Sequence, residues 1–241
     1  MKLEYSFTFA PPPRPAPVRG HAPQAFVGNR FAIGEREPRI VFSVDWPRIA
    51  LLDGFLTDEE CSGLIEVARA RLARSTVFER GDGTKSEIPG RTSQSAKIAR
   101  AENELVDRVE LRACALAGLA PDLGEPMEMV RYGQAEEYLP HYDWFDPATA
   151  PGRKQLGTHG QRIATVILYV SDVDAGGSTV FPRLGITIRP RRGSALYFWN
   201  LDRHGFPEPL TIHAGAPIER GEKTIVNKWF RERPWIESAP A

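Results

Sequence analysis

Three side chains able to bind a metal stand in a spacing that suggests a single site. His141 and Asp143 are separated by one residue, and His213 lies far along the chain. Alternate residues of a β-strand project from the same side, so the first two can face one ion if their segment is extended. Two imidazoles and one carboxylate suit a mononuclear Fe(II) site of the oxygenase type, whereas thiolates would favour structural zinc. The pattern alone is compatible with an iron site and also with strand residues that bind no metal.

The third ligand is not settled by composition alone. The run Leu-Thr-Ile-His at 210–213 is rich in β-branched residues, which predicts a strand that could carry His213 to the other two ligands. Three histidines compete with it from polar or proline-rich surroundings: His21 in an arm expected to be solvated, and His159 and His204 in expected loops. Cys61 and Cys114 show no ligand spacing. Composition favours His213 and leaves the others open.

Two longer stretches resemble the signature motifs of an enzyme family. Residues 129–143 read MVRYGQAEEYLPHYD, and residues 213–230 read HAGAPIERGEKTIVNKWF. Matching segments accompany them in the family's order: RTS at 91–93, QRIAT at 161–165, GGSTVF at 176–181 and GSALYF at 193–198. Together they closely resemble the prolyl 4-hydroxylase family of 2-oxoglutarate- and Fe(II)-dependent dioxygenases, over about residues 47 to 231. The resemblance implies that His141, Asp143 and His213 are the iron ligands.

The resemblance also implies a pocket for 2-oxoglutarate. Lys223, ten residues after His213 as in the family, would hold the carboxylate that is remote from the metal. A charge-assisted hydrogen bond of this kind contributes about 1.5–3 kcal/mol. Tyr132 and Thr179 would add hydroxyl donors. An extended segment from residue 223 to residue 230 would place four side chains on one face: Lys223, Ile225, Asn227 and Trp229.

The substrate pocket of the family corresponds to four further residues: Tyr138, Arg162, Trp229 and Arg91. Aromatic walls can clasp a saturated ring, and an arginine can donate hydrogen bonds to a peptide carbonyl. Tyr138 has the opposite strand parity to His141, so its inward placement requires a local break near Pro140.

By the same resemblance, 2-oxoglutarate and O₂ would be converted to succinate and CO₂ while an unactivated C–H bond is hydroxylated. The expected substrate is a prolyl residue in a peptide or protein, and ascorbate is a further candidate cofactor. One alternative keeps the chemistry and takes a free or carrier-bound amino acid such as proline. A second alternative is a non-catalytic jelly-roll binding module that has kept its metal, but such a module would not need Lys223.

Composition excludes several other classes of protein. The chain has 31 basic and 31 acidic residues and no net charge, which gives no electrostatic reason to bind nucleic acid or an anionic membrane. No apolar run approaches the roughly 20 residues of a membrane span, and the first residues do not resemble a secretory signal. Two cysteines do not make a disulfide framework. We therefore expect a cytoplasmic protein; composition does not address its oligomeric state.

The fold class expected is α+β, mainly β. From Met127 the hydrophobic period changes to two, which predicts about eight short strands in two packed sheets, and the resemblance implies a double-stranded β-helix, or jelly roll. We expect a proline-rich arm at 1–38 and a dioxygenase domain at 39–241. Within that domain, supporting helices would occupy about 55–120 and the jelly-roll core about 125–232.

Caps and turn residues predict the helices and loops. Thr57 and Glu60 fit a capping box for a helix that would run to about Arg74 and bury Cys61. A second helix is expected from Glu102 to Leu116, ending at Gly118. Loops are expected at 81–90, a candidate lid, and at 146–160. The alternating residues 5–9 could add an edge strand within the arm.

Overall fold

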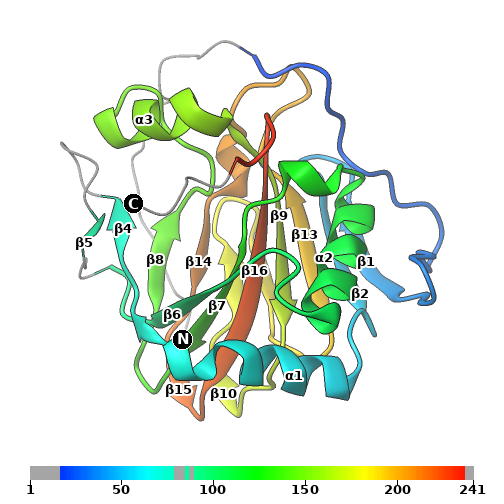
Figure 1. The fold of residues 1–241 in the computed structure, drawn as a ribbon, viewed down its shortest axis with the longest axis vertical. Coiled ribbons are helices and arrows are strands. Elements are labelled where there is room, and N and C mark those ends of the chain that lie inside the picture. Colours follow the sequence, from blue (N-terminus) through cyan, green and yellow to red (C-terminus); the bar gives the residue numbers. More distant parts are fainter. Residues whose placement is uncertain (1–16, 79–84, 87–89, 237–241) are drawn as a thin grey trace.

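The computed structural model describes residues 17–78, 85–86 and 90–236, and it forms two face-to-face β-sheets with helices on one side (Figure 1). The larger sheet has the strand order β1 (Arg39–Val44), β2 (Ile49–Asp53), β13 (Ala195–Trp199), β9 (Arg162–Tyr169), β16 (Lys223–Arg231), β7 (Met127–Tyr132), β6 (Gln94–Ile98) and β3 (Ala73–Arg74). The smaller sheet has the order β12 (Ile186–Ile188), β11 (Thr179–Phe181), β14 (His213–Gly215) and β8 (Tyr138–His141).

Two short ribbons complete the strands, β10 (Ala175–Gly176) with β15 (Ile218–Arg220), and β4 (Val77–Phe78) with β5 (Lys85–Ser86). All the strand pairs of the described residues are antiparallel. Between Met127 and residue 236 the structure has ten strands where about eight were predicted, because β10 and β15 form a ribbon outside the two sheets. The expected mainly-β jelly roll is confirmed.

Alternation along the strands of the larger sheet divides the core into two clusters. Side chains on one face, such as Val226 and Phe230 of β16, pack against the helices. Side chains on the other face, such as Ile167, Leu196 and Ile225, pack between the two sheets against Phe181 of β11. All residues of the central strand β16 are buried, so both of its faces are covered by other parts of the protein.

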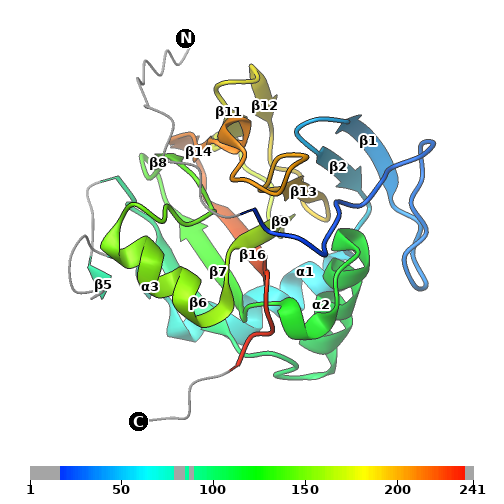
Figure 2. The ribbon, with the colours of Figure 1, turned by 90° about the horizontal axis from the view of Figure 1, so that it is seen from above.

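Helices α1 (Asp58–Ala68) and α2 (Glu104–Ala117) cover the outer face of the larger sheet (Figure 2). The capping box of α1 is present, and α2 ends at Gly118, which has a φ of 67°, as predicted. The prediction that the first helix would run to about Arg74 is wrong. After α1 the chain forms a single 3₁₀ turn, Arg69–Arg71, and then pairs with β6 as strand β3.

The segment expected to be a loop at 146–160 contains helix α3 (Ala150–His159), so that prediction is wrong. The side chain of Thr149 caps its first turn by accepting a hydrogen bond from the amide of Gly152. The carboxyl-terminal segment holds the helix: Arg231 donates to the carbonyl of Gln155, and Arg233 donates to that of Leu156. The helix therefore depends on tertiary contacts that its own sequence does not encode.

Residues 17–38 of the predicted arm lie against the body, where Phe26, Phe31 and Ile33 join the core between the larger sheet and its helices. The candidate edge strand at 5–9 and most of the candidate lid at 81–90 fall outside the described residues. In the part of the chain that the structure describes, no helix is both long and apolar enough to cross a membrane. Cys61 and Cys114 are buried free thiols.

A buried ion pair joins the two supporting helices. Arg112 of α2 donates to both carboxylate oxygens of Glu60 of α1, at 2.7 and 2.8 Å. Burial alone would raise the pKa of Glu60, but this arginine and the amide of Thr57 outweigh it and lower that pKa to about 2. The same carboxylate thus closes the capping box and connects α1 to α2.

Replacing Thr57 with alanine should lower the free energy of unfolding by about 1 kcal/mol, because the cap of α1 is lost. Urea denaturation would measure this loss. Thr57→Ser keeps the hydroxyl and should retain most of the stability. An unchanged denaturation midpoint in Thr57→Ala would contradict the capping role.

Candidate metal centre

The two histidines lie opposite one another across the smaller sheet. His141 of β8 is the register partner of His213 of β14, and their ring centroids are 4.3 Å apart. Asp143 follows two residues after β8 and brings its carboxylate between them, 3.9 Å from each Nε2 atom. The ligand atoms of all three residues lie within 4.8 Å of one another, as binding of one metal ion requires.

Both imidazoles are oriented by main-chain carbonyls. Nδ1 of His141 donates to the carbonyl of Leu139 at 2.8 Å, and Nδ1 of His213 donates to that of Thr211 at 3.0 Å. A ring nitrogen that faces a carbonyl must carry the proton, so in each neutral ring Nε2 is left as the lone-pair donor. These contacts fix the tautomer needed for a metal ligand.

Asp143 is held by a chain of hydrogen bonds from the larger sheet. Thr165 of β9 donates from Oγ1 to a carboxylate oxygen at 2.7 Å, and Asn200 donates to the same Thr165 oxygen at 3.0 Å. All three residues are buried. Sequence reasoning missed Thr165 and Asn200; the available signal was a polar residue on the interior face of an otherwise apolar strand.

The protonation states of His141 and Asp143 suit a divalent cation. Burial, together with the adjacent His213, lowers the pKa of His141 to about 3, so this imidazole is neutral at neutral pH. Burial raises the pKa of Asp143, but His213 and His141, followed by the charge of Arg162 and the Thr165 hydroxyl, outweigh burial and leave that pKa below its ordinary value. The neutral imidazole of His141 and the carboxylate of Asp143 therefore face the same point as Nε2 of His213.

Lys223 lies in the same cavity, which has a volume of about 800 Å³ and also contains the three candidate ligands. Its side chain is 2% exposed, and Nζ donates one hydrogen bond to the carbonyl of Gly177 at 2.8 Å. An ammonium has three donors, so it can still bind a carboxylate. With no described carboxylate beside it, burial lowers the pKa of Lys223 to about 7.

Tyr132 and Thr179 line this cavity with Lys223. Lys223 is the register partner of Tyr132 across β16 and β7, and its Nζ lies 5.0 Å from the tyrosine ring centroid. Thr179 accepts a hydrogen bond from the Tyr169 hydroxyl at 2.8 Å. Because that bond uses an acceptor site of Thr179, its own hydroxyl proton remains available to a ligand.

Tyr138 also reaches the site, because β8 contains the expected irregularity. His141 pairs with His213 but Tyr138 pairs with Gly215, so three steps along β8 face two steps along β14. Such a bulge changes the side to which the residues before it point. The Tyr138 ring consequently stacks on that of His141, with centroids 3.6 Å apart.

Arg162 and Trp229 line the same cavity as Tyr138. The guanidinium of Arg162 lies 4.0 Å from the Trp229 ring centroid and 4.9 Å from that of Phe145. It donates to both carboxylate oxygens of Glu125, at 2.7 and 2.9 Å. Burial opposes ionisation of Glu125, but Arg162 and Arg231 lower its pKa to about 2. The arginine is thus fixed in place by a residue that sequence reasoning missed.

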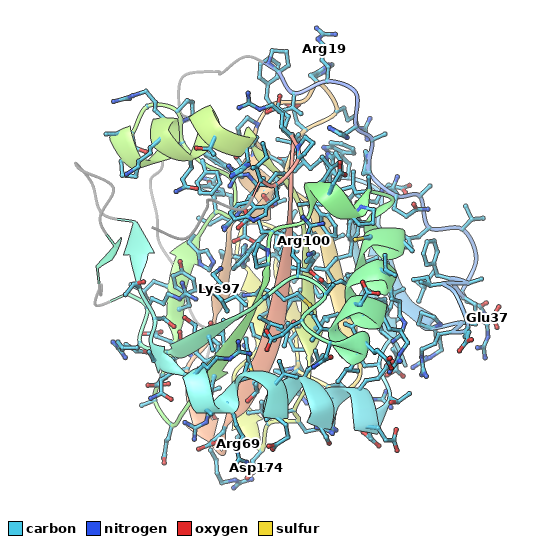
Figure 3. The ribbon with its side chains drawn as sticks, in the orientation of Figure 1. Arg19, Glu37, Arg69, Lys97, Arg100 and Asp174 are labelled. Carbon is cyan, nitrogen blue, oxygen red and sulfur yellow. The ribbon has the colours of Figure 1, made fainter. Side chains whose placement is uncertain are left out.

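Arg91 lies at the edge of the same cavity. It donates to Glu128 at 3.1 Å, and its guanidinium lies 5.1 Å from the Tyr138 ring centroid. Lys97 of β6, labelled in Figure 3, pairs with the same carboxylate at 3.5 Å. The ten candidate site residues therefore all line one cavity: His141, Asp143, His213, Lys223, Tyr132, Thr179, Tyr138, Arg162, Trp229 and Arg91.

The three competing histidines have other contacts. His21 hydrogen-bonds the carbonyl of Glu232, so it is not simply solvated as expected. His159 is the buried last residue of α3 rather than a loop residue, and it stacks on Trp235. His204 is exposed. The donor set that fits iron is the one with His213, because its Nε2 atoms and carboxylate converge in a cavity with open space.

Comparison with known proteins identifies the family. Residues 127–231 match the model of the 2OG-Fe(II) oxygenase superfamily. The chain is 33% identical over 219 residues to probable prolyl 4-hydroxylase 6 of Arabidopsis thaliana, covering 82% of this chain and 74% of the relative. The chain belongs to the prolyl 4-hydroxylase family.

Prolyl 4-hydroxylase subunit alpha-1 of Gallus gallus is 36% identical over 211 residues, which cover 85% of this chain. The chain spans about two fifths of the length of that relative, 41%. Among solved structures, the viral collagen prolyl hydroxylase of Paramecium bursaria Chlorella virus-1, in complex with 2OG, has a TM-score of 0.59 at 27% identity. That match covers 76% of this chain and 95% of the viral one.

Removing the hydroxyl that supports Asp143 should weaken metal binding. Thr165→Val deletes the donor to the carboxylate, and loss of such a supporting contact typically reduces metal affinity about 10- to 100-fold. Anaerobic equilibrium dialysis against Fe(II) would measure it. Thr165→Ser keeps the donor and serves as the control; equal affinities of the valine and serine variants would contradict the role given to Thr165.

Lys223 should make binding of 2-oxoglutarate depend on pH. A carboxylate beside the ammonium raises its pKa from about 7, so binding above pH 7 requires uptake of a proton. The apparent Kd should rise roughly tenfold per pH unit from pH 7 up to the pKa of the complex. Calorimetric titration with Mn(II) in place of iron would show it.

Lys223→Arg keeps a charge at all these pH values and should give a flat profile. A Kd of the unaltered protein that stays constant from pH 7 to 9 would contradict a carboxylate contact with Lys223.

Proposed function

We propose that this chain is an Fe(II)- and 2-oxoglutarate-dependent dioxygenase that hydroxylates a prolyl residue in a peptide or protein. The observation that carries the proposal is the shared cavity. Its lining includes the two histidines and Asp143, the buried Lys223, and the aromatic residues Tyr138 and Trp229. A dicarboxylate and a second, apolar molecule could thus both reach the same three ligand atoms within one cavity.

His141, Asp143 and His213 would hold the iron, and Lys223, Tyr132 and Thr179 would bind the remote carboxylate of 2-oxoglutarate. Bound Fe(II) would supply activation of O₂ and oxidative decarboxylation of 2-oxoglutarate to succinate and CO₂. The protein's own contribution is orientation and exclusion of water, because the residues around the ligands are mostly buried. In this proposal no side chain needs to act as an acid or a base.

The substrate side of the cavity fits a proline ring in a polypeptide. Tyr138 and Trp229 line the space beside the ligands, and saturated rings pack well on aromatic side chains. Arg162 is fixed by Glu125 through Nε and one terminal nitrogen, which leaves donor hydrogens for a carbonyl oxygen. A free amino acid remains the competing substrate.

Turnover separates the candidate substrates. With Fe(II), 2-oxoglutarate and O₂, proline-rich peptides should stimulate succinate release and gain one oxygen per hydroxylated residue by mass spectrometry. His213→Ala should abolish both signals while circular dichroism shows the fold retained. Stimulation by free proline alone would transfer the proposal to amino acid hydroxylation, and bound Fe(II) without turnover of 2-oxoglutarate would favour a binding module.

A further inference from the structure

The site described above leaves one sequence feature unused. Residues 11–17 read PPPRPAP, with five prolines in seven residues. Only Pro17 belongs to the described residues. A proline-rich sequence attached to a domain of this family is of the same chemical class as the substrate proposed above.

Hydrogen bonds hold the first described residues of the arm, from Val18 to Gln24, against the rest of the domain. The amide of Val18 donates to the carbonyl of Gly205 at 2.9 Å, and His21 bonds the carbonyl of Glu232 at 3.0 Å. The amide of Gln24 donates to the Tyr197 hydroxyl at 3.2 Å. Gly205 has a φ of 86°, and a Cβ there would meet the carbonyl oxygen of Val18 at 2.1 Å. The close approach of the two backbones therefore requires glycine.

These contacts of Val18, His21 and Gln24, here called the anchor, lie next to residues that line the active-site cavity. The amide of Glu232 donates to the carbonyl of Gln161, whose side chain bonds the amide and the carbonyl of Phe145. Phe145 and Trp235, three residues beyond Glu232, both line the cavity. Glu232, which accepts the hydrogen bond of His21, is thus connected through Gln161 to residues that line the cavity.

The figures show the described start of the arm at the same end of the molecule as α3. Arg19 of the arm lies at the same end of the molecule as α3 (Figure 3). Seen from above, the first described residues of the arm lie between α3 and the loop that precedes β14 (Figure 2). Helix α3 contributes Pro151, Gly152 and Gln155 to the cavity. The arm therefore enters the body at the end where the cavity is lined by α3.

We propose that the proline-rich segment 11–17 is a substrate of the chain's own active site, bound in cis. This inference rests on the proposed function. Seven residues in polyproline II span about 20 Å, and tethering gives a local concentration on the order of millimolar, so weak intrinsic binding suffices. Proline-rich segments commonly dock on aromatic surfaces, and besides Tyr132 the cavity has six aromatic residues: Tyr138, Tyr142, Trp144, Phe145, Trp229 and Trp235.

The reaction balances with the co-substrates already named. A ring C–H bond of an arm proline breaks and a C–OH bond forms with one atom of O₂. The second oxygen atom enters succinate as 2-oxoglutarate loses CO₂. Each event adds one oxygen to the protein and consumes one 2-oxoglutarate, without an added peptide.

Mass spectrometry of the full chain tests the proposal. Incubation with Fe(II), 2-oxoglutarate and O₂ should add one or more oxygens to proteolytic fragments that contain residues 11–17, and His213→Ala should show none. Mixing active protein with isotopically heavy His213→Ala protein distinguishes cis from trans. In cis, only the light arm is oxidised at micromolar concentration; oxidation of both arms to equal extents would overturn the proposal.

A binding measurement provides a readout apart from turnover. With Mn(II) in the metal site, the amide NMR signals of Arg14 and Ala16 should broaden relative to a sample with diamagnetic Zn(II). Replacing the prolines at 11, 12, 13 and 15 with serine should remove most of this broadening. Equal broadening in the two proteins, or none in either, would show that the prolines do not occupy the site.

The anchor has its own matched pair of variants. Gly205→Ala should displace Val18 and slow oxidation of the arm. Gly185→Ala imposes a similar positive φ, 66°, but a Cβ there meets nothing within 4 Å, so the rate should not change. Oxidation of the arm at equal rates in both variants would contradict the role of the anchor.

The outcomes separate this inference from the proposed function. If added proline-rich peptides are hydroxylated while residues 11–17 stay unmodified, the arm is not a substrate and the proposed function stands. If neither is modified and 2-oxoglutarate is not consumed, the proposed function itself fails.

Discussion

The register between β8 and β14 is the constraint on which the site depends. It sets His141 directly opposite His213, and the carbonyls of Leu139 in β8 and of Thr211, just before β14, orient the two rings. The bulge in β8 then brings Tyr138 to the same side as His141. A slip of one residue in this short pairing would turn these side chains away from one another, so metal binding and the substrate wall rest on the same few backbone hydrogen bonds.

A second constraint is the burial of charge inside the sandwich. Charged groups avoid an apolar interior unless they are paired, and most here are paired: Arg162 and Arg231 with Glu125, and Arg91 with Glu128. Lys223 differs, because its described hydrogen bond goes only to a carbonyl and burial lowers its pKa to about 7. A buried lysine without a carboxylate partner favours the binding of an anionic ligand, and in this way β16 contributes to the binding of 2-oxoglutarate.

The sequence was sufficient to predict those parts of the site that local pattern determines. The period of β16 predicted the face shared by Lys223 and Trp229, and strand parity predicted a break near Pro140. Contacts between distant segments were not predictable. Helix α3 contains proline and glycine and lacks an apolar stripe, so beyond the Thr149 cap its contacts with residues 231–235 hold it. Thr165 and Glu125 likewise gain their roles from partners far along the chain.

A crystal structure of the full chain grown anaerobically with Mn(II) and 2-oxoglutarate tests the central claim most directly. The account predicts one metal ion bound by Nε2 of His141, Nε2 of His213 and the carboxylate of Asp143, with the remote carboxylate of 2-oxoglutarate on Lys223. A metal held by a different set of residues, or a 2-oxoglutarate whose remote carboxylate does not contact Lys223, would contradict it.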